Sequence, residues 1–183
     1  MKILLFGKTG QLGWELERTL AALGKVHALG QNELDLQDLT ALKKVIHTTK
    51  PDVIVNASAY TAVDRAEQEK EIAMRVNAEA PGVMAQAAKE LRSVFIHYST
   101  DYVFDGHKTT PYEENDKVNP LNVYGQSKLN GEQAVAEARG AHVILRTSWV
   151  YSLRGDGFVS KVLRWARTQE ILKIVSDQVG SPT

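Results

Sequence analysis

The chain has 183 residues, enough for one well-buried α/β domain, and its 43% apolar and 24% charged residues match soluble globular proteins. Its 22 basic and 22 acidic residues cancel, so nothing indicates binding to nucleic acid or to an anionic membrane. The absence of cysteine excludes a disulfide framework, a thiol nucleophile and thiolate metal sites. The first apolar run is too short for a signal peptide or a membrane span, so we expect a cytoplasmic protein.

Short apolar runs alternate with segments of helical spacing along the chain. The first run, Lys2–Phe6, predicts a buried strand, and Gly7, Gly10 and Gly13 lead from it into a helix over 14–20. Further strands are predicted at 25–29, 53–56, 93–99, 142–147 and 171–175, and further helices at 38–48, 65–75, 81–91, 124–139 and 158–168. This alternation predicts an α/β fold, a doubly wound, Rossmann-like parallel sheet with helices on both faces, formed by residues 1–183.

Strand, glycine turn and helix in this order predict a nucleotide-binding site at the start of the chain. A helix N-terminus offers N–H donors and partial positive charge to a phosphate, and glycine has no Cβ to block its approach. The spacing is G-x-x-G-x-x-G, whereas ordinary dehydrogenases have G-x-G-x-x-G. Glycines also mark plain turns, but their position directly after a buried strand favours dinucleotide binding.

A phenol and an ammonium group fall on one face of a predicted helix, because Tyr124 and Lys128 are four residues apart. A cation beside a phenol is expected to lower its pKa toward values useful for proton transfer. The same spacing also occurs in ordinary amphipathic helices, so the pair alone does not distinguish a catalytic site from a helix surface. Thr100 adds a third group: it follows a predicted buried strand, at the edge of the sheet where ligands bind, and its hydroxyl would hold a substrate carbonyl oxygen.

The glycine turn, the strand-end Ser99-Thr100 and the Tyr-x-x-x-Lys motif, in this order, resemble the extended short-chain dehydrogenase/reductase superfamily over the whole chain. Finer motifs resemble the family of dTDP-4-dehydrorhamnose reductases: LLFGKTGQLG at 4–13, VNASAYTAVD at 55–64, YSTDYVFDG at 98–106, PLNVYGQSKL at 120–129 and RTSWVY at 146–151. That family reduces the 4-keto group of dTDP-4-dehydro-rhamnose to give dTDP-L-rhamnose. The resemblance therefore implies hydride transfer from NADPH or NADH to a dTDP-keto-sugar, with Tyr124 as proton donor.

The resemblance also implies roles for individual residues. Catalysis is expected of Thr100, Tyr124 and Lys128. Cofactor binding is expected of Gly7, Gly10, Gln11, Leu12, Gly13, Asp35, Leu36, Ala59, Tyr60, Thr61, Tyr98, Tyr124 and Lys128. Contacts with the sugar are expected of Thr61, Val63, Thr100, Asp101, Tyr102 and Trp149. For the aromatic rings of Tyr102 and Trp149, packing in the core is the alternative.

No metal site is expected, since the five histidines show no metal-ligand spacing. Some members of the resembled family bind Mg²⁺, and Glu15 falls at a ligand position, but a first-turn glutamate is favourable at a helix N-terminus anyway. The second predicted strand ends at Gly30 without a carboxylate for the ribose 2′-hydroxyl, so NADPH and NADH both stay open as cofactors. A homodimer also stays open.

Two other functions remain as alternatives. One is another nucleotide-sugar reductase or epimerase of the same superfamily. A dehydratase is disfavoured, because the dehydratases of this superfamily have an Asp-Glu pair after the strand-end Thr, whereas Asp101-Tyr102 follows Thr100 here. The other is a non-catalytic, cofactor-binding regulatory subunit. The superfamily builds much of its sugar pocket from a C-terminal lobe, expected to follow residue 183. We therefore expect the 183-residue chain alone to bind NADPH and to reduce the sugar poorly or not at all.

Overall fold

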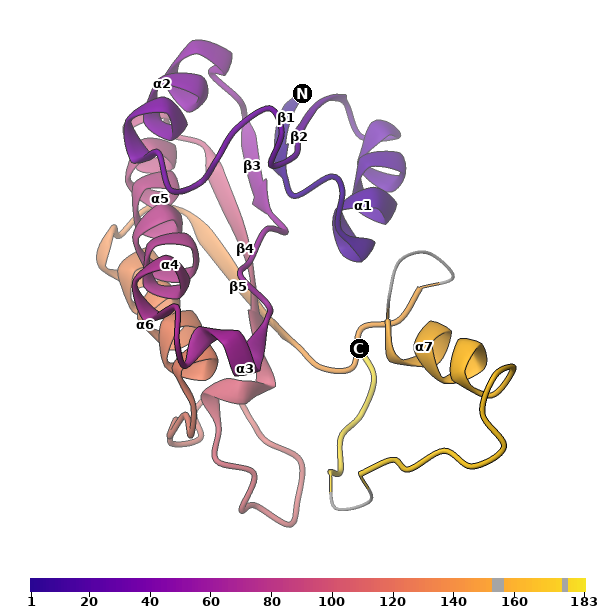
Figure 1. The fold of residues 1–183 in the computed structure, drawn as a ribbon. Helices are drawn as coiled ribbons and strands as arrows, with labels where there is room; N and C mark the ends of the chain where they lie inside the picture. Colours follow the sequence, from indigo (N-terminus) through magenta and orange to yellow (C-terminus); the bar gives the residue numbers. More distant parts are fainter. Residues whose placement is uncertain (153–156, 176–177) are drawn as a thin grey trace.

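The computed structural model describes residues 1–152, 157–175 and 178–183. Within them, five parallel strands form one sheet in the order β2-β1-β3-β4-β5 (Figure 1). The strands are β1 Lys2–Phe6, β2 Lys25–Leu29, β3 Val53–Asn56, β4 Val94–Thr100 and β5 His142–Thr147. The chain leaves β1 toward β2 on one side and returns to β3 on the other. The carboxyl ends of β1 and β3 therefore flank the switch point at which such sheets bind ligands.

Helices connect the strands and cover both faces of the sheet. They are α1 Gln11–Ala21, α2 Leu39–Thr49, α3 Val63–Ala66, α4 Lys70–Met74, α5 Ala80–Leu91, α6 Val123–Glu137 and α7 Phe158–Trp165. A π-helical turn, η1 Arg75–Glu79, joins α4 to α5, and a 3₁₀ turn, η2 Asp101–Val103, follows β4. In Figure 1, α2, α5 and α6 lie on one face of the sheet and α1 lies on the other. The predicted doubly wound, Rossmann-like fold is confirmed.

The side chains of β1 alternate between two cores, because successive residues of a strand point to opposite faces. Leu4 and Phe6 are buried with residues of α2 and α5, whereas Ile3 and Leu5 pack with residues of α1. Coverage on both faces explains why the first strand is a continuous apolar run rather than an alternating one. Among the described residues, no helix is both long and apolar enough to cross a membrane.

The predicted strand at 171–175 is wrong, because these residues form no strand, and Ile171 and Val175 are exposed. Apolar, β-branched residues form a strand only where a neighbouring strand accepts their hydrogen bonds. The helix predicted at 65–75 is divided into α3 and α4, and α4 continues through η1 into α5. At the break, Glu67 accepts from the N–H of Val123 and Glu69 accepts from the hydroxyl of Tyr60. Local spacing does not reveal such tertiary contacts.

Candidate active site

Two glycines of the turn after β1 are required by the fold itself. Gly7 has a left-handed φ of 93°, and a Cβ there would lie 2.8 Å from the carbonyl of Ala57. A Cβ at Gly13 would lie 1.9 Å from the oxygen of Gly7, so α1 packs directly on the turn. Any larger residue at either position would have to move the backbone.

Gly10 differs from these two, because the fold would accept a side chain there. It is the N-cap of α1, and a Cβ would make an ordinary 3.4 Å contact with the oxygen of Gly7. A glycine at this exposed position keeps the N-terminus of α1 open to a ligand, beside the half-buried Gln11 and Leu12. A dinucleotide fits this cradle, since its diphosphate would meet backbone N–H groups and the positive end of the helix dipole.

The end of β2 holds a carboxylate that the sequence analysis missed. The N–H of Gly30 donates to Oε2 of Glu33 at 2.8 Å, and Lys8 of the glycine turn forms an ion pair with the same carboxylate. A tight turn brings Glu33 back, since the N–H of Glu33 donates to the oxygen of Gly30 at 3.1 Å. The expectation that no carboxylate lies at this strand end is therefore wrong. Nearby, Asp35 is exposed, whereas Leu36 lies in the core.

The loop after β3, which contains Ala59, Tyr60 and Thr61, is held by a buried amide. Asn77 of η1 accepts from the N–H of Tyr60 at 2.8 Å and donates to its oxygen at 3.0 Å. Asn77 also donates to Oγ of Ser127 in α6, at 2.9 Å. The π-helical turn thus fixes this loop against the helix that carries Tyr124 and Lys128. The sequence analysis singled out neither Asn77 nor Ser127.

The three predicted catalytic side chains meet at the carboxyl end of β4. Lys128 is buried, and its ammonium donates to the backbone oxygen of Tyr98 at 2.7 Å. The Tyr124 hydroxyl shares a hydrogen bond with the side chain of Thr100, and its ring packs edge-on against Tyr102, with centroids 5.5 Å apart. Thr100 in turn accepts from the N–H of Tyr102 at 3.2 Å, which begins η2 and fixes the hydroxyl in place.

The expected influence of Lys128 on Tyr124 is wrong for this structure. Burial raises the pKa of Tyr124, and the hydrogen bond with Thr100 only partly offsets that effect. Burial also lowers the pKa of Lys128 to about 8, and its ammonium is directed to Tyr98. A phenol with a raised pKa keeps its proton at neutral pH, which suits a proton donor.

The low pKa of Lys128 predicts an unusual dependence of stability on pH. Between the folded value of about 8 and the ordinary value of 10.5, the unfolded chain binds a proton that the folded chain has lost. Raising the pH through this window should therefore stabilise the wild-type protein relative to Lys128→Met, by up to about 3 kcal/mol. Urea unfolding of both proteins across the window measures this difference.

Lys44→Met, an exposed substitution on α2, is the matched control and should keep the wild-type pH dependence. Parallel pH profiles for the wild type and Lys128→Met would contradict the low pKa of the buried lysine.

The residues expected to contact the sugar lie around the ends of β4 and β5. Asp101 accepts from the hydroxyl of Ser148 at 2.7 Å, which joins η2 to the segment that follows β5. Trp149 has a left-handed φ of 50° and is 41% exposed, and Tyr102 is 39% exposed, so neither ring is in the core. A pocket of about 460 Å³ is lined by Trp149, Val150, Tyr151, Phe158, Val159, Gly180 and Pro182.

Other predicted positions are less closely joined to this centre. Thr61 is exposed and Val63, the first residue of α3, is half-buried. Glu15, the candidate Mg²⁺ ligand, accepts from the hydroxyl of Ser152 at 3.3 Å. Within residues 1–152, 157–175 and 178–183, no group of three or more His, Asp or Glu side chains could hold a metal ion.

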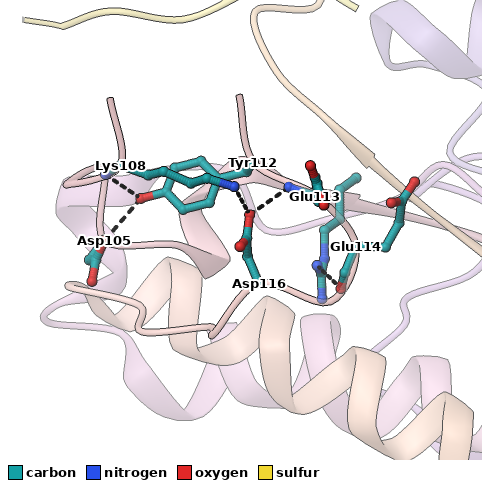
Figure 2. A network of polar contacts seen from close by, with 7 residues as sticks. Asp105, Lys108, Tyr112, Glu113, Glu114 and Asp116 are labelled. Carbon is teal, nitrogen blue, oxygen red and sulfur yellow. Dashed lines mark hydrogen bonds and ion pairs between the residues drawn. The ribbon is translucent and has the colours of Figure 1, made fainter. Parts of the chain in front are cut away.

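The loop between η2 and α6 is internally braced, as Figure 2 shows. The Tyr112 hydroxyl donates to Asp105 at 2.9 Å, Lys108 pairs with Asp116 at 2.5 Å, and the Tyr112 ring stacks on Phe104. Hydrogen bonds to its carboxylate hold the pKa of Asp105 at about 2. These contacts give the loop a defined conformation without a regular helix or strand.

A buried ion pair that the sequence analysis missed lies one helical turn after Lys128. Glu132 of α6 is 7% exposed and accepts from Nε and Nη2 of Arg146, at 2.9 and 2.6 Å. The hydroxyl of Ser99 donates to the same carboxylate at 2.5 Å. The network ties α6 to the ends of β4 and β5, and the negative charge of Glu132 opposes the lowering of the Lys128 pKa.

The fold and this site define a Rossmann-like α/β protein that brings the Thr100, Tyr124 and Lys128 side chains to the carboxyl edge of its sheet. Comparison with known families makes the assignment specific. The chain belongs to the RmlD substrate binding domain family, whose family model matches residues 1–183.

Curated proteins with similar sequences are named dTDP-4-dehydrorhamnose reductases. The chain is 52% identical over 183 residues to a dTDP-4-dehydrorhamnose reductase from Burkholderia thailandensis and 47% identical over 187 residues to one from Escherichia coli K12. All of the chain is covered in both alignments, but only 61% and 62% of the relatives. The chain thus spans about three fifths of the length of these curated relatives.

Solved structures show the same fold. A crystal structure of a dTDP-4-dehydrorhamnose reductase from Clostridium acetobutylicum has a TM-score of 0.95 and 39% identity. One from Bacillus anthracis, in complex with NADP, has a TM-score of 0.95 and 34% identity. Each comparison covers 100% of this chain and 65% of the solved chain.

Proposed function

We propose that the chain carries the cofactor site and the proton donor of an NAD(P)H-dependent dTDP-4-dehydrorhamnose reductase. The reaction reduces the 4-keto group of dTDP-4-dehydro-rhamnose to dTDP-L-rhamnose, in the cytoplasm. The observation that carries the proposal is the meeting of Thr100, Tyr124 and Lys128 at the sheet edge that also holds the glycine turn. The names of the relatives, and the NADP bound to the protein from Bacillus anthracis, support it.

When bound, NAD(P)H supplies the hydride for the keto carbon of the sugar. Tyr124 keeps its proton at neutral pH, because burial raises its pKa, and donates that proton to the keto oxygen as the oxygen gains negative charge. The hydroxyl of Thr100, fixed at the end of β4, donates a second hydrogen bond to the same oxygen. Lys128, held by the oxygen of Tyr98, binds the nicotinamide ribose.

The other assignments belong to the same proposal, with residues 1–183 forming the cofactor-binding domain. The turn of Gly7, Gly10 and Gly13, with Gln11 and Leu12, binds the pyrophosphate, and Asp35 with Leu36 lies against the adenine. The nicotinamide half is lined by Ala59, Tyr60, Thr61 and Tyr98. The sugar is contacted by Thr61, Val63, Thr100, Asp101, Tyr102 and Trp149.

The direct test combines the chain with NADPH and dTDP-4-dehydro-rhamnose. Calorimetry measures cofactor binding, and mass spectrometry of the sugar nucleotide, beside the absorbance of the reduced nicotinamide, measures reduction. We expect the 183-residue chain to bind the cofactor but to form little or no dTDP-L-rhamnose, and a polypeptide of the relatives' full length to form it readily.

Two results would favour the other functions. Cofactor binding without reduction, by this chain and by a polypeptide of the relatives' full length, would favour a non-catalytic regulatory subunit. An epimerised sugar without net oxidation of the cofactor would favour an epimerase.

A further inference from the structure

Two opposite charges meet beside the end of β2, outside the catalytic centre. Lys8, the residue after Gly7, pairs with Oε1 of Glu33, while the N–H of Gly30 donates to Oε2 at 2.8 Å. Both contacts lower the pKa of Glu33, so its carboxylate is charged at neutral pH. The two side chains are 30% and 44% exposed, which leaves both within reach of a ligand.

This position decides cofactor type in Rossmann-like sheets. An acidic group about 20 residues after the glycine turn binds the ribose 2′-hydroxyl of NAD, whereas a nearby cation accommodates the 2′-phosphate of NADP. Glu33 follows Gly13 by 20 residues, although its side chain reaches the strand end only through the turn at Gly30. The structure therefore places an acid and a cation at the point where other members of this fold class have one or the other.

Gly30, at the end of β2, has no room for a side chain of its own. A Cβ on Gly30 would lie 3.0 Å from Cγ2 of Thr9 and 3.1 Å from Oε2 of Glu33, tighter than most real contacts. A side chain at the strand end would have to displace its neighbours. The charged side chains beside the end of β2 are therefore those of Lys8, from the glycine turn, and Glu33, from the loop after β2.

We propose that Lys8 and Glu33 together select the cofactor, an inference that rests on the dinucleotide site of the proposed function. NADH donates its 2′-hydroxyl to Glu33, and the ion pair stays closed. The 2′-phosphate of NADPH replaces Glu33 as the partner of Lys8, and the pair opens. A partly exposed ion pair contributes little stability, so either arrangement is accessible and the protein accepts both cofactors.

The test measures dissociation constants of NADPH and NADH by calorimetry for the wild type, Lys8→Gln and Glu33→Gln. Lys8→Gln should weaken NADPH binding about tenfold and NADH binding less than about threefold, because only the phosphate needs the cation. Glu33→Gln should tighten NADPH binding by about threefold and weaken NADH binding by a similar factor, because it removes the charge that repels the phosphate and leaves only a weaker, uncharged acceptor for the hydroxyl. Added NaCl should weaken the binding of NADPH by the wild type more than its binding of NADH, because salt screens the attraction between Lys8 and the phosphate.

Two control variants make the same changes in charge elsewhere. Lys44→Gln on α2 and Glu137→Gln at the end of α6 are both exposed and should leave the ratio of the two dissociation constants unchanged. A ratio that moves by less than about twofold in either Lys8→Gln or Glu33→Gln overturns the inference. Equal weakening of both cofactors by Lys8→Gln also overturns it, since Lys8 would then bind a group that both share. If the wild type binds neither cofactor, the dinucleotide site fails and this inference with it.

Discussion

Tyr124→Phe is expected to slow reduction of the keto sugar by about 10²–10⁴-fold, the usual contribution of a general acid. The substitution removes one hydroxyl and keeps the ring that packs edge-on against Tyr102, so the site should keep its shape. Cofactor affinity should change by less than about threefold, because Lys128 and the glycine turn are untouched. Single-turnover experiments with protein in excess over sugar measure the reduction even where it is slow, and calorimetry measures the affinity.

Tyr112→Phe is the matched control for the loss of one hydroxyl. The Tyr112 hydroxyl braces the loop through Asp105 and the N–H of Lys108, and it is not among the residues of the proposed site. Its removal should change the rate of reduction by less than about tenfold, since no proton transfer depends on it. A rate for Tyr124→Phe within about threefold of the wild type would assign the proton donor to another residue.

The fold could be predicted because its strands are buried on both faces and are bounded by glycine, proline or polar residues. Lys2–Phe6 is an example: four of its five residues are buried, and Gly7 turns the chain at its end. The prediction failed for residues 171–175, where the composition is that of a strand but no described strand pairs with it. The composition of a segment indicates its preference for a strand, but a strand forms only where a neighbouring strand can pair with it.

The meeting of Thr100, Tyr124 and Lys128 could be predicted because two general rules place these three residues together. Ligands bind at the carboxyl ends of parallel strands, which singled out Thr100, and residues four apart share a helix face, which joined Tyr124 to Lys128. Neither rule gives electrostatics. The pKa of Tyr124 depends on how deeply α6 is buried and on where the Lys128 ammonium points, and both are tertiary properties.

The residues that sequence reasoning missed all act across long stretches of chain. Asn77 contacts Ser127, 50 positions away, and Lys8 contacts Glu33, 25 positions away. No periodicity relates such pairs, and a single sequence contains no record of which distant residues touch. A polar residue in an apolar helical segment, as Asn77 is, was the one local signal, because buried amides need partners.

Glu132→Ala is expected to lower the free energy of unfolding by about 3 kcal/mol, because it removes one partner of a buried ion pair. The variant leaves the Arg146 guanidinium without the two hydrogen bonds of 2.9 and 2.6 Å, and the Ser99 hydroxyl without its acceptor. The Arg146 side chain is 25% exposed and therefore partly hydrated. The expected loss of unfolding free energy is thus at the lower end of the range for broken buried ion pairs. Urea unfolding followed by circular dichroism measures it.

Glu137→Ala, an exposed substitution in the last turn of the same helix, is the control and should change stability by less than about 0.5 kcal/mol. The double variant Glu132→Met with Arg146→Met replaces both charges by apolar side chains and should recover much of the loss, since no charge stays unpaired. Equal effects of Glu132→Ala and Glu137→Ala would show that the pair contributes nothing. The charge of Glu132 raises the pKa of Lys128 in the folded chain, so Glu132→Ala should lower that pKa further. The rise of stability with pH that is due to Lys128 should then begin at a lower pH. A merely structural role of Glu132 would not change this pH dependence.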